Sequence, residues 1–440
     1  MKCRRGNRRE TVSDGTENRV GCCRSATPER ASTIMNSIVS APNIAIACGG
    51  TGGHLFPGLA VAEKLVERGC AVTLLISPKE VDQEAVKSAW GMEVVTLPAV
   101  ALQRGSTMAF VRGFKRSFGT SRRLFSAKRP QAALAMGGFT SAPPILAARS
   151  CGTPTFLHES NTVAGRANRW LSWVVRQAFV GFPSAAARLR NRSVTLTGTP
   201  VRPSFKAADP EVCRAELGFD PKRPVVLVVG GSQGASGLND LVLRALPILA
   251  RSGACLQWLH LAGPNDVEKV SQGYETARLD AVVHAFFDRM ELALGAATAA
   301  ISRAGASSLA ELAAMRVPAV LVPYPHATDN HQVHNAEAFV NTGAARMLQQ
   351  KLATPDLLAR MVLELVEQPA MRERMQAALG RWQSPRAAEQ IAEAILGNVE
   401  AGRAVRRPLK GASPWLLADG QGTARPTSAM TSLSHLYGKD

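Results

Sequence analysis

The stretch that decides the fold is the apolar run Ile44-Ala-Ile-Ala-Cys48, which leads directly into Gly49-Gly-Thr-Gly-Gly-His54. The same arrangement recurs where Val225-Val-Leu-Val-Val229 leads into Gly230-Gly-Ser-Gln-Gly234. A buried strand, a glycine turn and a helix gather free backbone N–H groups and the positive end of a helix dipole, which favours an anionic ligand. Two such units in one chain predict two Rossmann-like domains that face each other across a cleft.

Apolar strands and helices alternate along the rest of the chain. The expected strands are 43–48, 71–76, 93–97, 131–135, 154–157, 178–181 and 193–196, then 225–229, 255–261, 281–286, 297–301 and 318–322. The expected helices are 58–68, 236–250, 307–315, 331–341, 355–368 and 385–396. Near-continuous apolar strands separated by helices predict the α/β class, with parallel sheets covered on both faces.

Composition bounds the class of protein. The chain has 440 residues, 46% of them hydrophobic, and a formal net charge of +18. It has no apolar run of membrane-spanning length and no secretory signal pattern, so we expect a cytosolic, soluble or peripheral protein. The expected parts are a disordered basic extension (1–42), two domains (43–198 and 199–380), a last helical segment (381–404) and a mobile tail (405–440).

The first glycine turn does not match the two common nucleotide motifs. Leu55 stands where a dinucleotide fingerprint needs its last glycine, and the second strand ends at Ile76-Ser-Pro-Lys79 without an acidic residue for a ribose. Neither glycine turn carries the Gly-Lys-Ser/Thr of a P-loop. A dehydrogenase is therefore disfavoured. What is left is a turn for a phosphate or polar ligand, or else a purely structural turn.

Two side chains beside small-residue turns are candidates for chemistry. His54 opens the first helix, where the helix dipole should lower its pKa and favour a neutral general base; the alternative is a capping or orienting residue. In Ile301-Ser-Arg-Ala-Gly-Ala-Ser-Ser-Leu-Ala-Glu311, a turn again precedes a helix. Its N-terminus suits a diphosphate, and Glu311 suits paired sugar hydroxyls unless it is merely a solvated charge.

A metal site is not expected. His326, His331, His334 and Asp329 share a Pro-containing loop, but their spacing fits no standard zinc site. The chain contains no Asp-x-Asp pair to hold Mg²⁺ on a diphosphate. We therefore expect neither a metal nor another cofactor.

Residues 102–129 mix basic and aromatic side chains, which is typical of contact with an anionic membrane surface. RNA binding and a partly buried helix with a solvated face are the alternatives, and we expect no nucleic-acid partner. The residues expected at the membrane are Phe110, Arg112, Phe114, Lys115, Arg116, Phe118, Arg122 and Arg123.

Eight short segments together resemble the MurG family of bacterial peptidoglycan N-acetylglucosaminyltransferases. In the family's order they are Gly49-Gly-Thr-Gly-Gly-His-Leu-Phe-Pro-Gly58, Gly137-Gly-Phe-Thr-Ser-Ala142, His158-Glu-Ser-Asn161, Gly198-Thr-Pro-Val-Arg202, Gly230-Gly-Ser-Gln-Gly-Ala235, Phe286-Phe-Asp-Arg-Met290, Ser302-Arg-Ala-Gly305 and Asp329-Asn-His-Gln332. The resemblance covers residues 43–398. Ser160 and His331 depart from it, since the family usually has Gln at the first position and some members have Gln at the second.

The resemblance implies a GT-B fold whose last helix returns to the first domain. It implies inverting transfer of N-acetylglucosamine from UDP-N-acetylglucosamine to the muramyl 4-hydroxyl of lipid I (undecaprenyl-pyrophosphoryl-N-acetylmuramyl-pentapeptide), giving lipid II. It also implies a peripheral location on the cytoplasmic face of the bacterial inner membrane, and leaves open contacts with other cell-wall synthesis and division proteins. The alternatives are a UDP-N-acetylglucosamine 2-epimerase and a non-catalytic nucleotide-sugar sensor.

The resemblance also assigns site residues. The donor contacts are Thr51, Gly52, Gly53, Asn161, Arg202, Ser232, Gln233, Phe286, Phe287, Arg303, Ala306, Ser307, Ser308, Leu309, Ala310, Glu311 and Gln332. The acceptor contacts are His54, Gly137, Gly138, Thr140, Ser141, His158 and Asn161. His54 is the first candidate for the catalytic base and Glu159 the next.

Overall fold

The computed structural model describes residues 41–89, 91–100, 107–231 and 234–406. The extension expected before residue 41 and the tail expected after residue 406 lie outside these residues. Among the helices that are described, none combines the length and apolar character needed to cross a bilayer.

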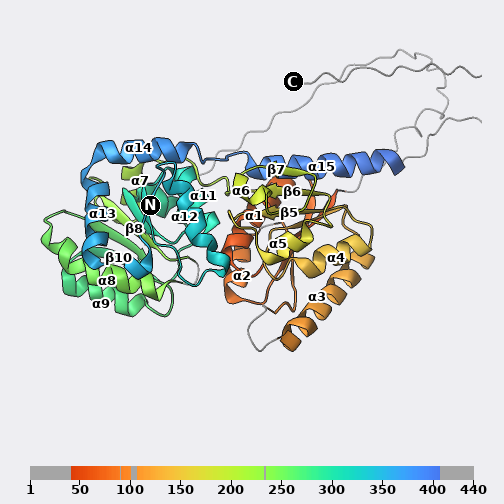
Figure 1. Cartoon of the computed structure of the whole chain (residues 1–440), viewed down its shortest axis with the longest axis horizontal. Coiled ribbons are helices and arrows are strands. Elements are labelled where there is room, and N and C mark those ends of the chain that lie inside the picture. Colours follow the sequence, from red (N-terminus) through yellow and green to blue (C-terminus); the bar gives the residue numbers. More distant parts are fainter. Residues whose placement is uncertain (1–40, 90, 101–106, 232–233, 407–440) are drawn as a thin grey trace, which may run out of the picture. The chain divides into compact units, whose positions relative to one another are not determined.

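The first half of the described chain forms a seven-stranded parallel sheet in the order β3-β2-β1-β4-β5-β6-β7. Figure 1 labels β5, β6 and β7 of this sheet. Its strands are β1 (Asn43–Ala47), β2 (Ala71–Ile76), β3 (Glu93–Thr96), β4 (Ala132–Ala135), β5 (Thr155–Glu159), β6 (Gln177–Val180) and β7 (Val194–Leu196). Each expected strand of this half has a counterpart here, because short apolar runs bounded by turn residues are a strong strand signal.

The second half forms a six-stranded parallel sheet in the order β10-β9-β8-β11-β12-β13. Its strands are β8 (Val225–Val229), β9 (Gln257–Leu261), β10 (Asp280–His284), β11 (Ala299–Ser302), β12 (Ala319–Leu321) and β13 (Arg346–Met347). The strand β13 was not predicted, since two residues give no readable period. The two sheets together make the doubly wound α/β architecture expected of a GT-B fold.

Helices cover the sheets. In the first half they are α1 (Gly52–Glu67), α2 (Glu80–Ala85), α3 (Thr107–Ala127), α4 (Ala142–Ser150), α5 (Arg166–Leu171) and α6 (Pro183–Ala186). In the second half they are α7 (Pro210–Glu216), α8 (Ser236–Arg251), α9 (Val267–Ala277), α10 (Met290–Ala296), α11 (Ala306–Met315), α12 (His331–Val340), α13 (Pro355–Glu367), α14 (Pro369–Gly380) and α15 (Ala387–Arg406). Short 3-10 turns occupy Val86–Ser88, Thr328–Asn330 and Gln350–Leu352.

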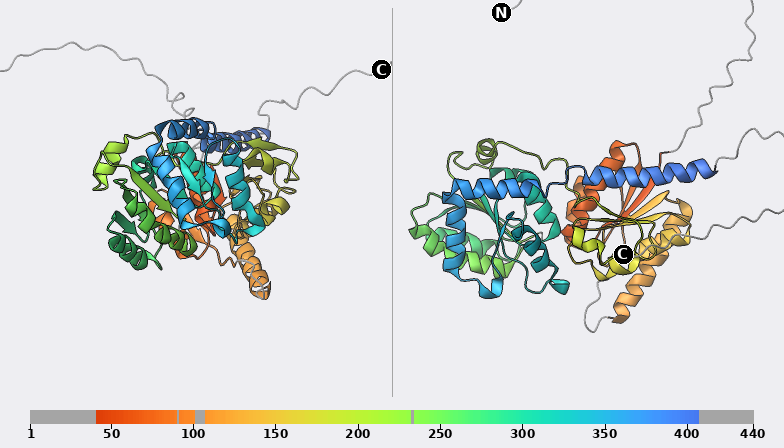
Figure 2. Two further views of the ribbon diagram at one scale, coloured as in Figure 1. Left: turned by 60° about the vertical axis from the view of Figure 1, so that its left-hand side comes forward. Right: turned by 45° about the horizontal axis from the view of Figure 1, so that its top comes forward.

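The core of the first sheet has two apolar layers because successive strand side chains point to opposite faces. Ile44 and Ile46 pack with residues of α1 and α15, whereas Ala45 and Ala47 pack on the other face with residues of α3 and α4. Figure 2 shows α15, in blue, beside the red and orange elements of this sheet. The last helix is thus part of the core of the first sheet.

Candidate functional site

Each sheet places two small-residue turns at its topological switch point, where parallel α/β sheets bind ligands. In the first sheet β1 and β4 are neighbours, and the turns that follow them begin at Gly49 and Gly137. In the second sheet β8 and β11 are neighbours, and they lead to Gly230 and the turn before α11. The geometry therefore marks four turns as candidate ligand contacts.

The first turn accepts only glycine at two positions. A Cβ on Gly49 would collide with the Ser77 backbone, and Gly50 has φ +113°, a conformation that L side chains rarely adopt. The chain then enters α1 directly, with the helix beginning at Gly52 rather than at residue 58. The first-turn N–H groups of Gly52 and Gly53 precede any intrahelical partner and face the switch point.

His54 lies in the first turn of α1 and packs against Gly137 and Gly138 in the turn that follows β4. Its Nδ1 is 2.8 Å from Thr51 Oγ1, and its ring is so close to Gly137 that a Cβ there would approach Nε2 to 3.0 Å. The pKa of His54 is lowered, in the direction that the sequence predicts; burial is the main cause, and the Glu159 carboxylate opposes the shift. A neutral ring at neutral pH can accept a proton.

Glu159 ends β5 with its carboxylate fully hydrogen-bonded and only 2% of its surface exposed. Oε1 accepts from the backbone N and the Nδ2 of Asn161 at 2.9 and 3.1 Å. Oε2 accepts from Gly165 N at 2.9 Å and Asn168 Nδ2 at 3.0 Å. These four bonds use the acceptor capacity of an ionised carboxylate, which leaves Glu159 better suited to orient and stabilise charge than to take a proton.

His158 points away from the turn toward the linker that follows β7. Its Nε2 is 3.0 Å from Gly198 O, and its Nδ1 is 3.2 Å from Ser160 Oγ. Burial lowers the pKa of His158 to about 4, so the ring is neutral at neutral pH. Its visible role is to tie β5 to the linker.

The turn after β4 is rigid. Gly137 and Gly138 have φ +103° and +75°. Ser141 Oγ bonds the carbonyls of Ala47 and Gly137 at 3.1 and 2.5 Å, which ties this turn to β1. The buried hydroxyl of Thr140 has no hydrogen-bond partner among the described residues.

The N-terminus of α11 is a candidate anion site of the second sheet. Gly305 caps the helix without a side-chain hydrogen bond, so the first backbone N–H groups keep their binding capacity. Ser307 is 9% exposed, and its Oγ has no partner among the described residues. The donor contacts expected at Ala306, Ser308, Leu309 and Ala310 belong to this same first turn and the one after it.

Glu311 in α11 lies close enough to Arg202 in the linker for the Arg202 charge to affect the pKa of Glu311. Burial raises the pKa of Glu311 to about 7, while the Arg202 guanidinium opposes that shift. Arg202 lies over the rings of Phe56 and Phe205, at 5.5 and 5.4 Å from their centroids. Its buried Nε has no partner among the described residues. An anion beside α11 would meet this cation.

Arg303 and Gln332 shape the turn before α11 from inside. Arg303 is 5% exposed and donates from Nη1 to the carbonyls of Val322 and Pro323 at 2.9 and 3.2 Å. Burial lowers the pKa of its guanidinium to about 10. Gln332 Oε1 accepts from the backbone N–H groups of Ala304 and Tyr324. Both side chains thus form hydrogen bonds with backbone groups, a structural role that was not predicted from the sequence.

The other expected donor contacts are Phe286, Phe287, Ser232 and Gln233. Phe286 is 43% exposed, and Phe287 stacks on His284 with ring centroids 5.1 Å apart. Ser232 and Gln233 lie outside the described residues. No group of three or more His, Cys, Asp or Glu side chains within the described segments could hold a metal ion.

Two buried amides beside the candidate site, Asn168 and Asn335, were not predicted from the sequence. Asn335 is fully buried; its Oδ1 accepts from the N and Oγ1 of Thr162, and its Nδ2 donates to Asn161 Oδ1 and Ala304 O. This amide therefore links α12 to the loop after β5. The only sequence signal was its position in the helix that follows Asp329-Asn-His-Gln332.

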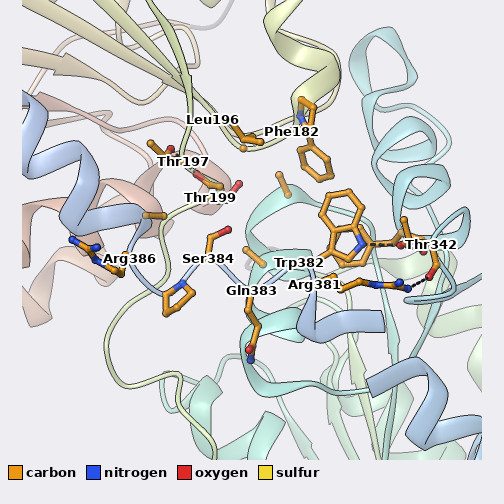
Figure 3. A pocket seen from close by; sticks show the side chains of 18 of the residues that line it. Phe182, Leu196, Thr197, Thr199, Thr342, Arg381, Trp382, Gln383, Ser384 and Arg386 are labelled. Carbon is orange, nitrogen blue, oxygen red and sulfur yellow. Dashed lines mark hydrogen bonds between the residues drawn. The ribbon is translucent and has the colours of Figure 1, made fainter. Parts of the chain in front are cut away.

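A pocket of about 950 Å³ lies between two linkers, the one that follows β7 (residues 197–203) and the one between α14 and α15 (residues 381–386) (Figure 3). A Cβ on Gly198 would collide with Ser384, so the linkers touch there. Trp382 stacks on Phe339 with centroids 4.5 Å apart, and its Nε1 donates to Thr342 Oγ1 at 2.7 Å. The labelled side chains show a wall that is aromatic on one side and polar on the other. This contact fixes the path of the chain between the sheets.

The basic–aromatic stretch forms α3, whose two faces differ. Its buried stripe consists of Gly113, Ser117, Ser121 and Phe125, at intervals of four residues. By helical geometry the basic residues lie on the opposite face. These exposed side chains, none of which forms an ion pair with another described residue, are Arg112, Lys115, Arg116, Arg122 and Arg123. Phe110 and Phe114 flank the stripe with ring centroids 6.2 Å apart.

Comparison with known proteins shows the family to which the chain belongs. Residues 44–180 match the glycosyltransferase family 28 N-terminal domain, and residues 225–391 match the C-terminal domain of the same family. The UDP-N-acetylglucosamine–N-acetylmuramyl-(pentapeptide) pyrophosphoryl-undecaprenol N-acetylglucosamine transferase of Anaeromyxobacter sp. (strain K) is 37% identical over 366 residues. That match covers 80% of this chain and 91% of the relative.

Solved structures agree. The crystal structure of Acinetobacter baumannii MurG is similar with a TM-score of 0.63 and 28% identity, over 81% of this chain and 99% of that one. A putative UDP-N-acetylglucosamine 2-epimerase from Listeria monocytogenes has a TM-score of 0.61 at 13% identity, over 82% of this chain and 97% of that one; this likeness shows the fold alone. The chain belongs to glycosyltransferase family 28 and, within it, to the MurG family of N-acetylglucosamine transferases.

Proposed function

We propose that the chain transfers N-acetylglucosamine from UDP-N-acetylglucosamine to the muramyl 4-hydroxyl of lipid I, with inversion at the anomeric carbon. The observation that carries this function is the pairing of two sites: a neutral His54 at the switch point of the first sheet, and the uncapped helix α11 of the second, which carries Glu311 and has Arg202 of the linker near that carboxylate. The relatives' names supply the donor and the acceptor.

The chemistry follows from these parts. The acceptor hydroxyl attacks the anomeric carbon while UDP leaves, so negative charge develops on the diphosphate. The N–H groups of α11 and the Arg202 cation stabilise that charge. His54 takes the hydroxyl proton, and the nearby Glu159 carboxylate stabilises the imidazolium that results.

An incubation with UDP-N-acetylglucosamine and a soluble lipid I analogue tests this function. The expected product is a disaccharide on the analogue together with free UDP. UDP-N-acetylmannosamine would instead identify an epimerase, which needs no acceptor and gives no use to the basic face of α3. Absence of turnover with both substrates would leave only nucleotide-sugar binding and would refute the proposal.

Glu311→Ala should weaken UDP binding by about 1.5–3 kcal/mol, because a carboxylate accepting ribose hydroxyls makes charge-assisted hydrogen bonds. The ionised form binds the ribose, and the pKa of Glu311 is about 7. Wild-type affinity should therefore rise with pH, with Kd about tenfold lower at pH 8 than at pH 6. Calorimetry measures both effects. An unchanged Kd in Glu311→Ala would discard the role.

The same pKa makes a stability prediction of opposite sign. A carboxyl whose pKa is higher in the folded state contributes stability below its unfolded value, and this contribution is lost as pH rises through about 7. Glu311→Gln should therefore raise Tm at pH 8 and have little effect at pH 5. A lower Tm at pH 8 would contradict the raised pKa of this half-buried carboxyl.

Activity should survive EDTA, because the chain has no Asp-x-Asp pair to hold a divalent cation on the diphosphate. The measurement is the rate of UDP release with and without chelator. Complete loss of activity on chelation, restored by Mg²⁺ or Mn²⁺, would overturn the metal-free mechanism.

We further propose that the protein binds peripherally to the cytoplasmic face of the membrane through the basic face of α3. It should sediment with anionic vesicles and dissociate at high salt, because exposed charges are screened within about 10 Å at 0.1 M salt. Replacing Arg112, Lys115, Arg116, Arg122 and Arg123 with Gln should reduce sedimentation. Unchanged binding would show that this face is only solvated, or that other parts of the chain carry the attraction.

A further inference from the structure

A buried carboxylate behind the first glycine turn has no role in the reaction described so far. Asp82 in α2 is fully buried. Its Oδ2 accepts from Gly50 N at 2.6 Å, from Ser77 N at 3.3 Å and from Ser77 Oγ at 2.5 Å. Its Oδ1 is also buried and has no partner among the described residues. Burying an ionisable group costs stability unless hydrogen bonds or a paired charge offset the cost.

Two side chains of the segment 79–82 form hydrogen bonds with the backbone of Gly50. Asp82 accepts a hydrogen bond from the Gly50 N–H, and Lys79 Nζ donates one to the Gly50 carbonyl at 2.8 Å. Lys79 also lies over the Phe139 ring, 5.6 Å from its centroid. The side chains of Asp82 and Lys79 thus hold both peptide groups of Gly50, a residue with positive φ. This N–H group is used within the protein and is not free to bind phosphate.

The turn held in this way leads directly to the candidate base. Thr51 follows Gly50, and its hydroxyl lies 2.8 Å from His54 Nδ1. The ring nitrogen Nε2 is then the one directed past Gly137. Displacement of Gly50 would move Thr51, and with it the hydrogen bond that orients the imidazole.

Charged groups from several elements face His54. Glu159 from β5 and Asp82 from α2 favour the protonated ring, whereas His331 from α12 and Lys79 from the segment before α2 oppose it. Asp82 therefore contributes to the field at the imidazole as well as to its placement. A general base becomes cationic as it takes its proton, so a fixed carboxylate nearby stabilises the charge that develops.

We propose that Asp82 is a positioning residue for glycosyl transfer, which fixes the first glycine turn and stabilises His54 as it takes the acceptor proton. The inference rests on the proposed function, because it gives the turn a place in that reaction. Asp82 touches neither substrate; it acts through Gly50 and His54.

The test is a double-mutant cycle with soluble acceptor. Asp82→Asn should lower kcat by about 10- to 100-fold, the size expected when a reacting group is misplaced by about an ångström. The fall in kcat should exceed any rise in the KM for UDP-N-acetylglucosamine, although the same turn carries the expected donor contacts Thr51, Gly52 and Gly53; a change in KM alone would contradict the proposal. In a His54→Asn background the same change should leave kcat unaltered. Glu84→Gln is the matched control, because Glu84 is exposed on the same helix, pairs with Lys87 and should have no effect.

A second readout does not depend on turnover. The pKa of His54, followed by NMR with His54→Asn to assign the signal, should fall in Asp82→Asn because one of the two carboxylates that raise it is gone. If Asp82→Asn does not fold, Ser77→Ala keeps the charge and removes a bond to Oδ2, and its kcat loss should likewise vanish in the His54→Asn background.

Equal kcat losses with and without His54, or an unchanged His54 pKa in a folded Asp82→Asn protein, would overturn the proposal. A wild-type protein that forms no disaccharide would instead refute the proposed function. The NMR reading would still decide whether Asp82 acts on His54.

Discussion

His54→Ala is expected to lower kcat by about 10²–10⁴-fold, the usual contribution of a general base, and to leave UDP affinity nearly unchanged. Burial lowers the pKa of this ring, so it is neutral and able to accept a proton at neutral pH. Stopped assays with saturating donor measure kcat, and calorimetry measures UDP binding. The acid limb of the rate profile should lie below the ordinary titration range of histidine.

His54→Asn separates the base from the orienting alternative. The asparagine can still bond Thr51 but cannot act as an effective base. If this variant keeps near-normal kcat, His54 only orients the acceptor and the base lies elsewhere. Glu159 would be the next candidate, although it would have to release at least one of its four N–H donors to accept a proton.

Glu159→Gln is expected to have the second-largest effect, on stability as well as on rate. The glutamine NH₂ would face N–H donors that now bond a carboxylate oxygen, and each buried group left unsatisfied costs about 1–3 kcal/mol. Tm should fall, and kcat should fall at least about tenfold as the loop carrying Asn161 and Asn168 loosens.

The control for Glu159→Gln is Glu67→Gln, which removes an exposed carboxylate paired with Lys64 on α1. An exposed pair of this kind contributes about 0–1 kcal/mol, so Tm and kcat should stay near wild type. A Glu159→Gln protein with unchanged Tm and kcat would show that the four observed bonds are not needed for the site.

Most strands of the two sheets could be predicted from the sequence because they are apolar runs bounded by turn residues. Val225–Val229, for example, is wholly apolar and is buried along its full length. Helices such as α14 were missed, because its low amphipathicity gives no clear period: only Met375, Ala378 and Leu379 are buried. The start of α1 was placed too late because glycines 52 and 53 are poor helix formers, yet the helix begins at Gly52.

The candidate site could be predicted only in part. The turns at Gly49 and before α11 could be predicted from their small-residue composition. No local pattern predicts the hydrogen bonds of Asp82 with Gly50 or of Asn335 with Thr162. Such contacts join residues far apart in the chain and depend on tertiary packing. Arg303 illustrates the reverse: a cation beside an anion site suggests a ligand contact, but here its guanidinium holds two backbone carbonyls.

The anomeric configuration of the product tests the central claim most directly. Wild-type protein would be incubated with UDP-N-acetylglucosamine and a lipid I analogue, and the isolated product examined by NMR. The account predicts a disaccharide in which N-acetylglucosamine is β-linked to the muramyl 4-oxygen, because one displacement assisted by His54 inverts the α-linked donor. An α-linked disaccharide, or UDP-N-acetylmannosamine without any disaccharide, would contradict it.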